Sequence, residues 1–504
     1  MHNAKDLLFS LYSKGVYVWT EGGRIGARAC RGQMLPEDLD QLRSLKAEII
    51  ELLEKASTGS GLPLRPRPSG CSIPLTSTQL ATWNYLKDSG MMSRRMCVTS
   101  VRVRGPLDIS CLQNSIKAVV RRHESLRTRF VTDHGLPRQH VEEECGDHLE
   151  VVDISHVALS ESENHVRRLA EEFVEDEVNL SVGPLFAAKL FRLSPVEHVL
   201  TLALDHIISD GVSNAILGRE ILTVYRQAIQ GLPISLPSLS VQFPDYAVWQ
   251  NQTRDGWSAE HGEYLKRHLS GAPELQFPSD SHATKAENPI GVRLQCLLGN
   301  TLSQGLRNVA RREQTLLATV VLTAYVAVVS RWCNQRDFLV LFESNGRTRP
   351  ELESMIGCLA GSLYLRVEME PNDCLLDLLK RIHLELCAAY DHQRIDTAPD
   401  IVPGCSRTDV YFNWQSPFSA FTDLQAEAPS DLTIEPFSVV RKPVPFRFGS
   451  FFFDSAAGIT WSVEYRPDLL VESTVDWFGH HLRLFAEELV QRPLTRLASV
   501  PMNV

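Results

Sequence analysis

The first 56 residues alternate between helical and strand-like spacing of apolar positions. Apolar side chains recur at helical spacing up to residue 14. Two strand-like runs at 16–19 and 24–28 then flank a Glu-Gly-Gly turn, which is typical of a β-hairpin. Beyond Pro36, apolar residues return at helical spacing to about residue 55. The pattern predicts a small module over 1–56, built from a helix, a hairpin and a second helix.

The rest of the chain predicts two larger units of mixed character. Residues 57–72 are rich in Gly, Ser and Pro without an apolar period, which indicates a linker. Helix-like and strand-like segments alternate from residue 73 onward, and no repeat is visible. We therefore predict two packed lobes, 73–250 and 251–504. The segments expected in them are a helix from Asp108 to the polar run 121–124, helices at 213–228, 301–312 and 314–332, strands at 199–204 and 338–342, and a hairpin near 459–465.

Composition narrows the class of protein. The chain has 504 residues, 43% of them apolar and 22% charged, with a formal net charge of −10, which indicates a globular protein without a nucleic-acid partner. Its 11 cysteines are scattered without metal-ligand spacing, so we expect reduced thiols, no metal site and a cytoplasmic location. The longest apolar stretch, 316–330, is shorter than the roughly twenty residues of a membrane span, so no membrane partner is expected.

One histidine stands out as candidate chemistry. His206 follows the apolar run 199–204 and lies between Asp205 and Asp210, ahead of a predicted helix. An imidazole titrates near neutral pH, so it could take a proton from an attacking amine or hydroxyl, or orient it. The residues alone also allow a structural histidine and a helix-capping aspartate. No nucleophile elbow, P-loop, dinucleotide fingerprint or zinc-protease motif competes with it.

Spaced motifs, taken together, are more specific than His206 alone. The segments concerned are, in chain order, Pro74–Trp83, Arg122–Phe130, Asp205–Gly211, Asp245–Trp249, Gly346-Arg347 with Glu351–Gly357, and Asp391–Gln393. With these motifs in the family's order, the sequence from residue 73 resembles the condensation domain of nonribosomal peptide synthetases. Residues 1–56 resemble the β-hairpin docking domain at the start of such synthetase proteins.

The resemblance implies a fold, a reaction and site residues. The fold class is α/β (α+β), with two chloramphenicol-acetyltransferase-like lobes in a V around a central tunnel. A donor acyl chain on the phosphopantetheine arm of a carrier protein enters the tunnel from one side. A small-molecule or carrier-bound acceptor amine or alcohol enters from the other, and the enzyme has no cofactor of its own. The residues implied are His206, Asp210, Gly211 and Arg347 as catalytic, with Arg347 holding Asp210, and Ser213 and Asn413 as substrate-binding.

The hairpin module implies a protein partner. The exposed edge of a hairpin can accept an added strand, so the acidic C-terminal tail of an upstream acyl or peptidyl carrier protein could bind there. Alternatively, the hairpin charges only solvate the edge and protect it from aggregation. The residues expected to bind the partner are Val16, Trp19, Arg24, Arg28, Arg31 and Lys46.

Three departures from the family pattern leave alternatives open. Asp205 stands where the family has its first histidine, and with Asp210 and Ser213 it forms a pattern that resembles the heterocyclization relatives. The segment 359–362 and Arg394 also differ from the family motifs. The rivals are therefore a heterocyclization domain and a noncatalytic recruiting domain, although the retained His206 favours condensation. Because no adenylation or carrier-protein motif occurs, we expect a free-standing, chain-releasing enzyme.

Overall fold

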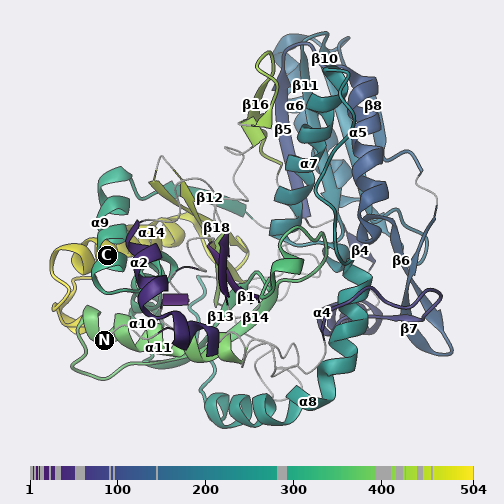
Figure 1. Ribbon diagram of the computed structural model, residues 1–504. Coiled ribbons are helices and arrows are strands. Elements are labelled where there is room, and N and C mark those ends of the chain that lie inside the picture. The colour runs from purple at the N-terminus through teal and green to yellow at the C-terminus, as the bar shows by residue number, and fades with distance from the viewer. Residues whose placement is uncertain are drawn as a thin grey trace.

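The computed structural model places most of the chain in a small N-terminal domain and two larger lobes (Figure 1). It describes all residues except 1–3, 5–6, 9–10, 12–15, 22–23, 29–35, 52–62, 90–91, 95–96, 144–145, 281–291, 393–409, 416–423, 426, 440–446, 456–457 and 503–504.

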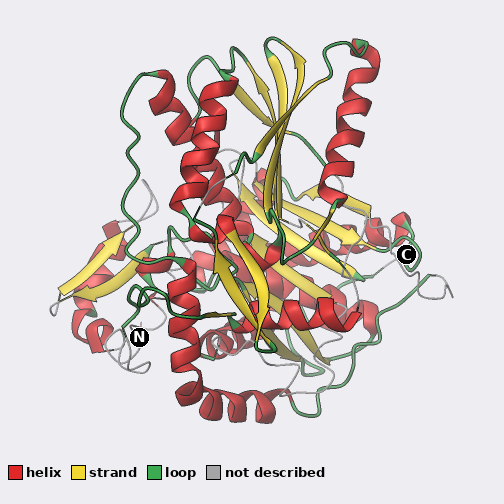
Figure 2. Cartoon of the chain, turned by 90° about the vertical axis from the view of Figure 1, so that its right-hand side faces the viewer, coloured by secondary structure: helices red, strands yellow, loops and turns green. Residues whose placement is uncertain are grey.

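The N-terminal domain contains the predicted hairpin and helix. Strands β1 (Tyr17–Glu21) and β2 (Arg24–Arg28) pair antiparallel, and helix α2 (Pro36–Ser44) continues after a turn as helical residues 46–51. The hairpin lies at the left edge of Figure 2, near the N-terminus. Its core joins the first helical residues to the later helix and consists of Ala4, Leu7, Leu11, Val16, Leu42 and Ile49.

The first lobe is a five-stranded sheet covered by helices. The strand order is β16-β5-β11-β10-β8, and β10 pairs antiparallel with β11 and parallel with β8. The helix predicted from Asp108 begins at Ile109, because Asp108 is its cap. The strand predicted at 199–204 begins earlier, at Glu197. The elements of the sheet are β5 (Cys97–Arg104), β8 (Leu149–Asp153), β10 (Phe186–Ser194), β11 (Glu197–Leu204) and β16 (Thr433–Pro436); the helices are α4 (Ser77–Ser89), α5 (Ile109–Arg122), α6 (Leu159–Glu175) and α7 (Gly211–Ile229).

Shorter elements complete this lobe at its base. They form a three-stranded sheet and a strand pair, together with two 3-10 helices. These elements are β3 (Ile73–Pro74), β6 (Thr128–Asp133) and β7 (Leu136–Val141); β4 (Ser93–Arg94) and β9 (Glu177–Val178); and η1 (Glu124–Arg127) and η2 (His206–Ile208).

The second lobe is a six-stranded sheet in the order β12-β18-β17-β15-β13-β14. Its core packs the largely buried α10 against one face of the sheet. The strands are β12 (Val292–Leu297), β13 (Asp337–Ser344), β14 (Gly361–Glu368), β15 (Val410–Gln415), β17 (Phe448–Ser455) and β18 (Gly458–Tyr465); the helices are α9 (Asn300–Arg312), α10 (Leu317–Cys333), α11 (Leu375–Asp391), α14 (Glu472–Gln491), η3 (Pro350–Leu352) and η6 (Leu497–Ser499).

The boundary predicted between the lobes at 250/251 is wrong. Helix α8 (Phe243–Leu269) continues without a break across residues 250 and 251. In addition, β16 lies late in the sequence yet pairs with β5 of the first lobe. Figure 1 shows β16 beside β5, while α8 runs below both lobes. The two lobes therefore share elements and are not two consecutive halves of the chain.

Residues 63–72, the later part of the predicted linker, form a strap that packs on the body of the protein. Leu64 is buried in a cluster with Trp249, and the Arg67 guanidinium binds Asp245 at 2.7 Å and Glu124 at 2.8 Å. Composition could not show this, because a single arginine anchors an otherwise linker-like segment. The strap starts the condensation-like part of the chain at the junction of η1 and α8.

Within the described residues, no single helix is long and apolar enough to cross a membrane, and only the bent pair α9 and α10 passes that test jointly.

Candidate active site

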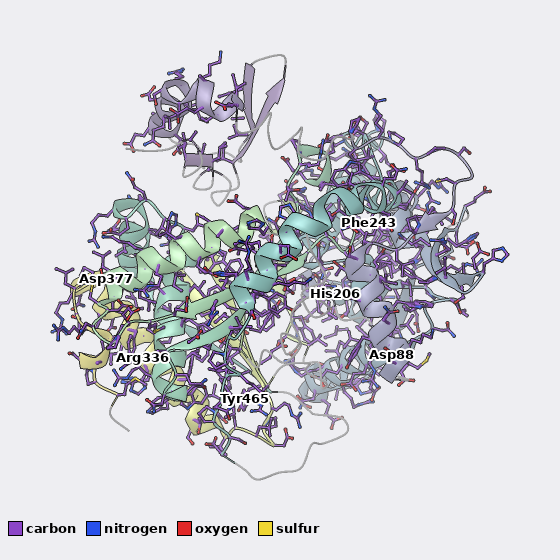
Figure 3. All side chains as sticks on the ribbon, turned by 90° about the horizontal axis from the view of Figure 1, so that it is seen from below. Asp88, His206, Phe243, Arg336, Asp377 and Tyr465 are labelled. Atoms are coloured by element: carbon purple, nitrogen blue, oxygen red, sulfur yellow. The ribbon has the colours of Figure 1, made fainter. Side chains whose placement is uncertain are left out.

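His206 is presented by a strand, a short turn and a helix. Strand β11 ends at Leu204, η2 begins at His206, and α7 begins at Gly211. The Gln79 side chain of α4 donates to the Ile207 carbonyl at 2.9 Å and so fixes the turn from outside. The His206 side chain is exposed, although its neighbours in the turn are buried. Figure 3 shows His206 near the junction of the two lobes.

The turn is tied to the second lobe by a buried ion pair. Asp210 and Arg347 are each about 1% exposed, and two Arg347 nitrogens donate to the two Asp210 carboxylate oxygens at 2.9 and 3.1 Å. The backbone N–H groups of Leu359 and Ala360 add hydrogen bonds to the same carboxylate at 3.0 and 3.1 Å. Such a bidentate pair fixes orientation as well as charge. The structure thus brings Asp210 and Arg347 together, as the family resemblance implies.

The environment of Asp210 favours its ionised form. Burial by itself raises the pKa of the Asp210 carboxyl group, but the charge and hydrogen bonds of Arg347 outweigh it, together with those from Ser213. The pKa therefore lies below its ordinary value. Asp210 stays charged and structural, and it also caps α7 by accepting from the Ser213 N–H at 2.8 Å.

Ser213 does not face a substrate, so its predicted binding role is wrong. Its side chain is fully buried, and its hydroxyl lies within 2.8 Å of Asp210 and 3.2 Å of Arg347. The same oxygen accepts from the Gly357 N–H at 3.1 Å. Because these contacts already use the hydroxyl, Ser213 is part of the buried contacts around Asp210 and Arg347 that join the two lobes.

Asp205 has a local structural role. It is 1% exposed, and its carboxylate accepts from the Ile207 N–H at 3.0 Å and from the Ser93 hydroxyl at 2.5 Å. Asp205 therefore caps η2, the turn that carries His206. The short carboxylate thus satisfies a backbone donor of the turn.

The imidazole of His206 contacts a thiol on one side. Its Nδ1 lies 3.7 Å from the Sγ of Cys358, a buried residue just before Leu359. The Nε2 atom makes no hydrogen bond to any residue that the structure describes. That nitrogen is therefore the one available to a substrate. Sequence reasoning missed Cys358, because nothing in its local pattern places it beside the histidine.

A polar row on β13 and β15 contains Asn413. The Tyr411 hydroxyl donates to Glu343 at 3.1 Å, the Asn413 amide donates to Tyr411 at 2.7 Å, and Gln415 donates to Asn413 at 2.8 Å. Gln415 in turn approaches Gly211, where a Cβ atom would lie 3.1 Å from its Oε1. The row thus reaches the start of α7, and substrate binding by Asn413 stays a prediction.

The residues predicted to bind a partner have different placements. Val16 is fully buried in the core of the small domain, so its side chain does not face a partner, and contact through its main chain stays a prediction. Trp19, Arg24 and Arg28 occupy hairpin positions that alternate with the core-packed Val18 and Ile25, but their side chains lie outside the described residues. Lys46 is exposed on the later helix, and Arg31 lies outside the described residues.

Family comparison identifies two segments. The condensation domain family matches residues 71–502, and the TubC N-terminal docking domain family matches residues 5–55.

Curated relatives are much longer proteins. The chain is 26% identical over 466 residues to gramicidin S synthase 2 of Brevibacillus brevis, covering 90% of this chain and 10% of that protein. It is 28% identical over 451 residues to phosphinothricin tripeptide synthetase PhsC of Streptomyces viridochromogenes, covering 88% of this chain and 41% of that protein. The chain thus spans less than half the length of either relative.

Solved structures share the fold. The X-domain from teicoplanin biosynthesis has a TM-score of 0.75 at 21% identity and covers 87% of this chain and all of that one. The first condensation domain of the calcium-dependent antibiotic synthetase has a TM-score of 0.71 at 18% identity, covering 86% and 100%. The EpoB cyclization-docking bidomain from Sorangium cellulosum has a TM-score of 0.71 at 18% identity, covering 97% and 99%.

Proposed function

We propose, since this chain belongs to the condensation domain family and carries a docking domain of the TubC type, that it transfers an acyl chain from a carrier-protein thioester to an amine or hydroxyl acceptor. The observation that carries the proposal is the placement of His206. Its imidazole is exposed near the lobe junction, on a turn that the Asp210–Arg347 pair locks to the second lobe.

The chemistry requires one proton acceptor beside the nucleophile. The acceptor N–H or O–H attacks the thioester carbonyl, a bond to the carbonyl carbon forms, and the carbon–sulfur bond to phosphopantetheine breaks. The Nε2 of His206 takes or orients the proton of the nucleophile, because its Nδ1 faces Cys358. The transferred chain is a polyketide or peptidyl chain, and transfer releases it, as in the chain-releasing enzyme of enacyloxin assembly, which this domain arrangement resembles.

The first experiment is intact-mass spectrometry of an acyl-loaded carrier protein. The carrier bears its natural C-terminal tail and is mixed with the enzyme and a panel of amines, alcohols and carrier-bound amino acids. We expect acceptor-dependent loss of the acyl mass, with the amide or ester identified in the same spectra. The His206→Ala variant should fold normally and transfer at least about 100-fold more slowly.

Three outcomes would contradict transfer chemistry by His206. Wild-type turnover by His206→Ala would remove the histidine from the mechanism. Failure with every acceptor, despite binding of the carrier tail, would favour a noncatalytic recruiting domain, and loss of a water from a Cys, Ser or Thr product would favour heterocyclization.

The docking domain is proposed to bind the acidic tail of the upstream carrier as an added strand of the hairpin. Lys46→Glu reverses an exposed charge of that domain, and Lys87→Glu makes the same change at an exposed site on α4. We expect only Lys46→Glu to weaken carrier-dependent turnover, with activity on small thioester mimics unchanged. Equal behaviour of the two variants would contradict the role of Lys46.

A further inference from the structure

Glu343 is an acidic side chain, held by a hydrogen bond from Tyr411, that the chemistry above does not use. It lies near the end of β13, where Val340 and Phe342 alternate into the core of the second lobe. Glu343 is therefore on the other face of the sheet, directly opposite Ser362 of β14. The carboxyl group therefore lies outside the hydrophobic core of the second lobe.

The charges around Glu343 link it to the turn of His206. Burial raises the pKa of the Glu343 carboxyl group above its ordinary value, whereas positive charge on His206 lowers it and the negative charge of Asp210 raises it. On β15, burial and the nearby Glu343 raise the pKa of Tyr411, which keeps that phenol protonated as a donor. The negative charge of Glu464 on β18 also raises the pKa of Tyr411. Glu343 thus shares one electrostatic environment with His206 across the lobe junction.

We propose that Glu343 and His206 form an acid–base pair in which Glu343 is the general acid for the departing thiol. The inference rests on the proposed function. While the acceptor attacks the thioester carbonyl, His206 takes the proton of the nucleophile and the carboxylic acid of Glu343 gives its proton to the pantetheine sulfur. The imidazolium then returns a proton to the Glu343 carboxylate, so the reaction needs no further reactant.

The division of labour follows from the two environments. Two titratable groups whose surroundings differ can hold opposite protonation states at one pH. His206 is exposed, whereas Glu343 is in a setting that favours its neutral acid. A neutral carboxylic acid can donate to sulfur as the carbon–sulfur bond breaks, and this contribution is typically about 10²–10⁴-fold in rate.

The polar row on β15 positions Glu343. Tyr411 donates to Glu343 and receives a hydrogen bond from Asn413, which is held in turn by Gln415 beside Gly211. The row therefore connects the carboxyl group to the first residue of α7. In this scheme Tyr411 is a positioning residue.

The decisive test varies the leaving group. Glu343→Gln keeps the size of the side chain and an acceptor for Tyr411, but it removes the acidic proton. Single-turnover transfer is measured with an alkyl thioester and with an aryl thioester of the same acyl chain. We expect a loss of at least about 100-fold with the alkyl thioester and less than about 10-fold with the aryl one, because an acidic aryl thiol leaves without protonation. Glu368→Gln, an exposed change on the adjacent β14, is the matched control and should match wild type.

The result separates this inference from the proposed function. If wild type transfers and Glu343→Gln loses nothing, or loses equally with both thioesters, the acid–base pair is wrong and transfer stands. If wild type transfers to no acceptor, an infrared titration decides. The infrared band of the protonated Glu343 carboxyl group is identified by its absence from Glu343→Gln. In wild type this band should persist above the pH range in which glutamate ordinarily ionises. His206→Ala should raise the midpoint pH of its loss further. Absence of that band overturns the pair independently of transfer.

Discussion

At the scale of single residues, the site depends on charges that belong to different lobes. Asp210 caps the helix that follows His206, and Arg347, which completes its surroundings, comes from the second lobe. Both side chains are removed from water, so each needs the other to offset its desolvation. Removing one partner of such a pair leaves a buried uncompensated charge.

Asp210→Asn tests this dependence directly. We expect the free energy of unfolding to fall by about 3–5 kcal/mol, because Arg347 loses its buried counter-charge. Chemical denaturation measures the change. The matched control is Glu172→Gln, which removes one partner of the exposed Arg168–Glu172 pair and should cost under about 1 kcal/mol. Similar costs for both variants would contradict the argument.

The same carboxyl group predicts a pH dependence of stability. The folded-state pKa of Asp210 is lowered, so its contribution is present above the unfolded value of about 3.9 and is lost as pH falls toward the folded value. We expect wild-type stability to decline in that acid range and Asp210→Asn to decline less steeply. Urea denaturation at a series of pH values measures both slopes. Parallel slopes would show that Asp210 contributes no such linkage.

Sequence reasoning at this scale identified some residues and missed others. His206, Asp210 and Arg347 followed from family motifs, and the structure brings Asp210 and Arg347 together. Glu343 was missed because the strand-like pattern of 338–342 ends before it. Its local signal is alternation, since Val340 and Phe342 face the core and place Glu343 on the opposite face.

At the scale of elements, the turn after β13 determines where Arg347 lies. Gly346 has a φ of +65°, and a Cβ atom on it would lie 1.7 Å from the Leu359 carbonyl oxygen. Only glycine fits both the backbone conformation and this approach. The segment that follows Leu359 also donates to Asp210, so the turn and the ion pair are built together.

Gly346→Ala is predicted to disturb both the turn after β13 and the Asp210–Arg347 ion pair. Gly231→Ala is the control, because Gly231 has nearly the same φ of +66° and no atom within 4 Å of its Cβ position. The control should cost about 1–2 kcal/mol of unfolding free energy from backbone strain alone. Gly346→Ala should cost more and also slow acyl transfer, since the Leu359 backbone must shift. Equal costs in denaturation experiments would mean that the close approach is unimportant.

Local patterns predicted elements well where the signal was long. The helix predicted from Asp108 begins at Ile109 with Asp108 as its cap, and the strand predicted at 199–204 lies within β11. The short strand β16 was not predicted, because four residues that end in proline carry little strand signal. Its pairing with β5 bridges a long stretch of sequence, so only the tertiary fold determines it.

At the scale of the whole molecule, the strap connects the docking domain to the body of the protein. Arg67 contacts Glu124 of η1 and Asp245 of α8, and it lies close after the end of the small domain. Because the strap is anchored there, fewer residues separate a bound carrier from the body of the protein. A shorter tether raises the effective concentration of the donor.

Arg67→Ala should therefore lower stability and carrier-dependent turnover together. Loss of its ion pairs with two carboxylates, one of them hydrogen-bonded, predicts a cost of about 1–3 kcal/mol in unfolding free energy. Turnover of a small thioester mimic should change less than turnover of the carrier-bound donor. Arg65→Ala, an exposed change in the same strap, should leave all three measurements unchanged. A matching loss in Arg65→Ala would show that the anchor is not specific.

The shared ion pair also sets an order of events during synthesis. A ribosome makes Asp210 long before Arg347, and β16 follows later still. A nascent first lobe therefore lacks both the partner of its buried carboxylate and the last strand of its sheet. The histidine turn can be locked only after Arg347 has been made, so an emerging fragment that contains His206 but ends before Arg347 should remain inactive.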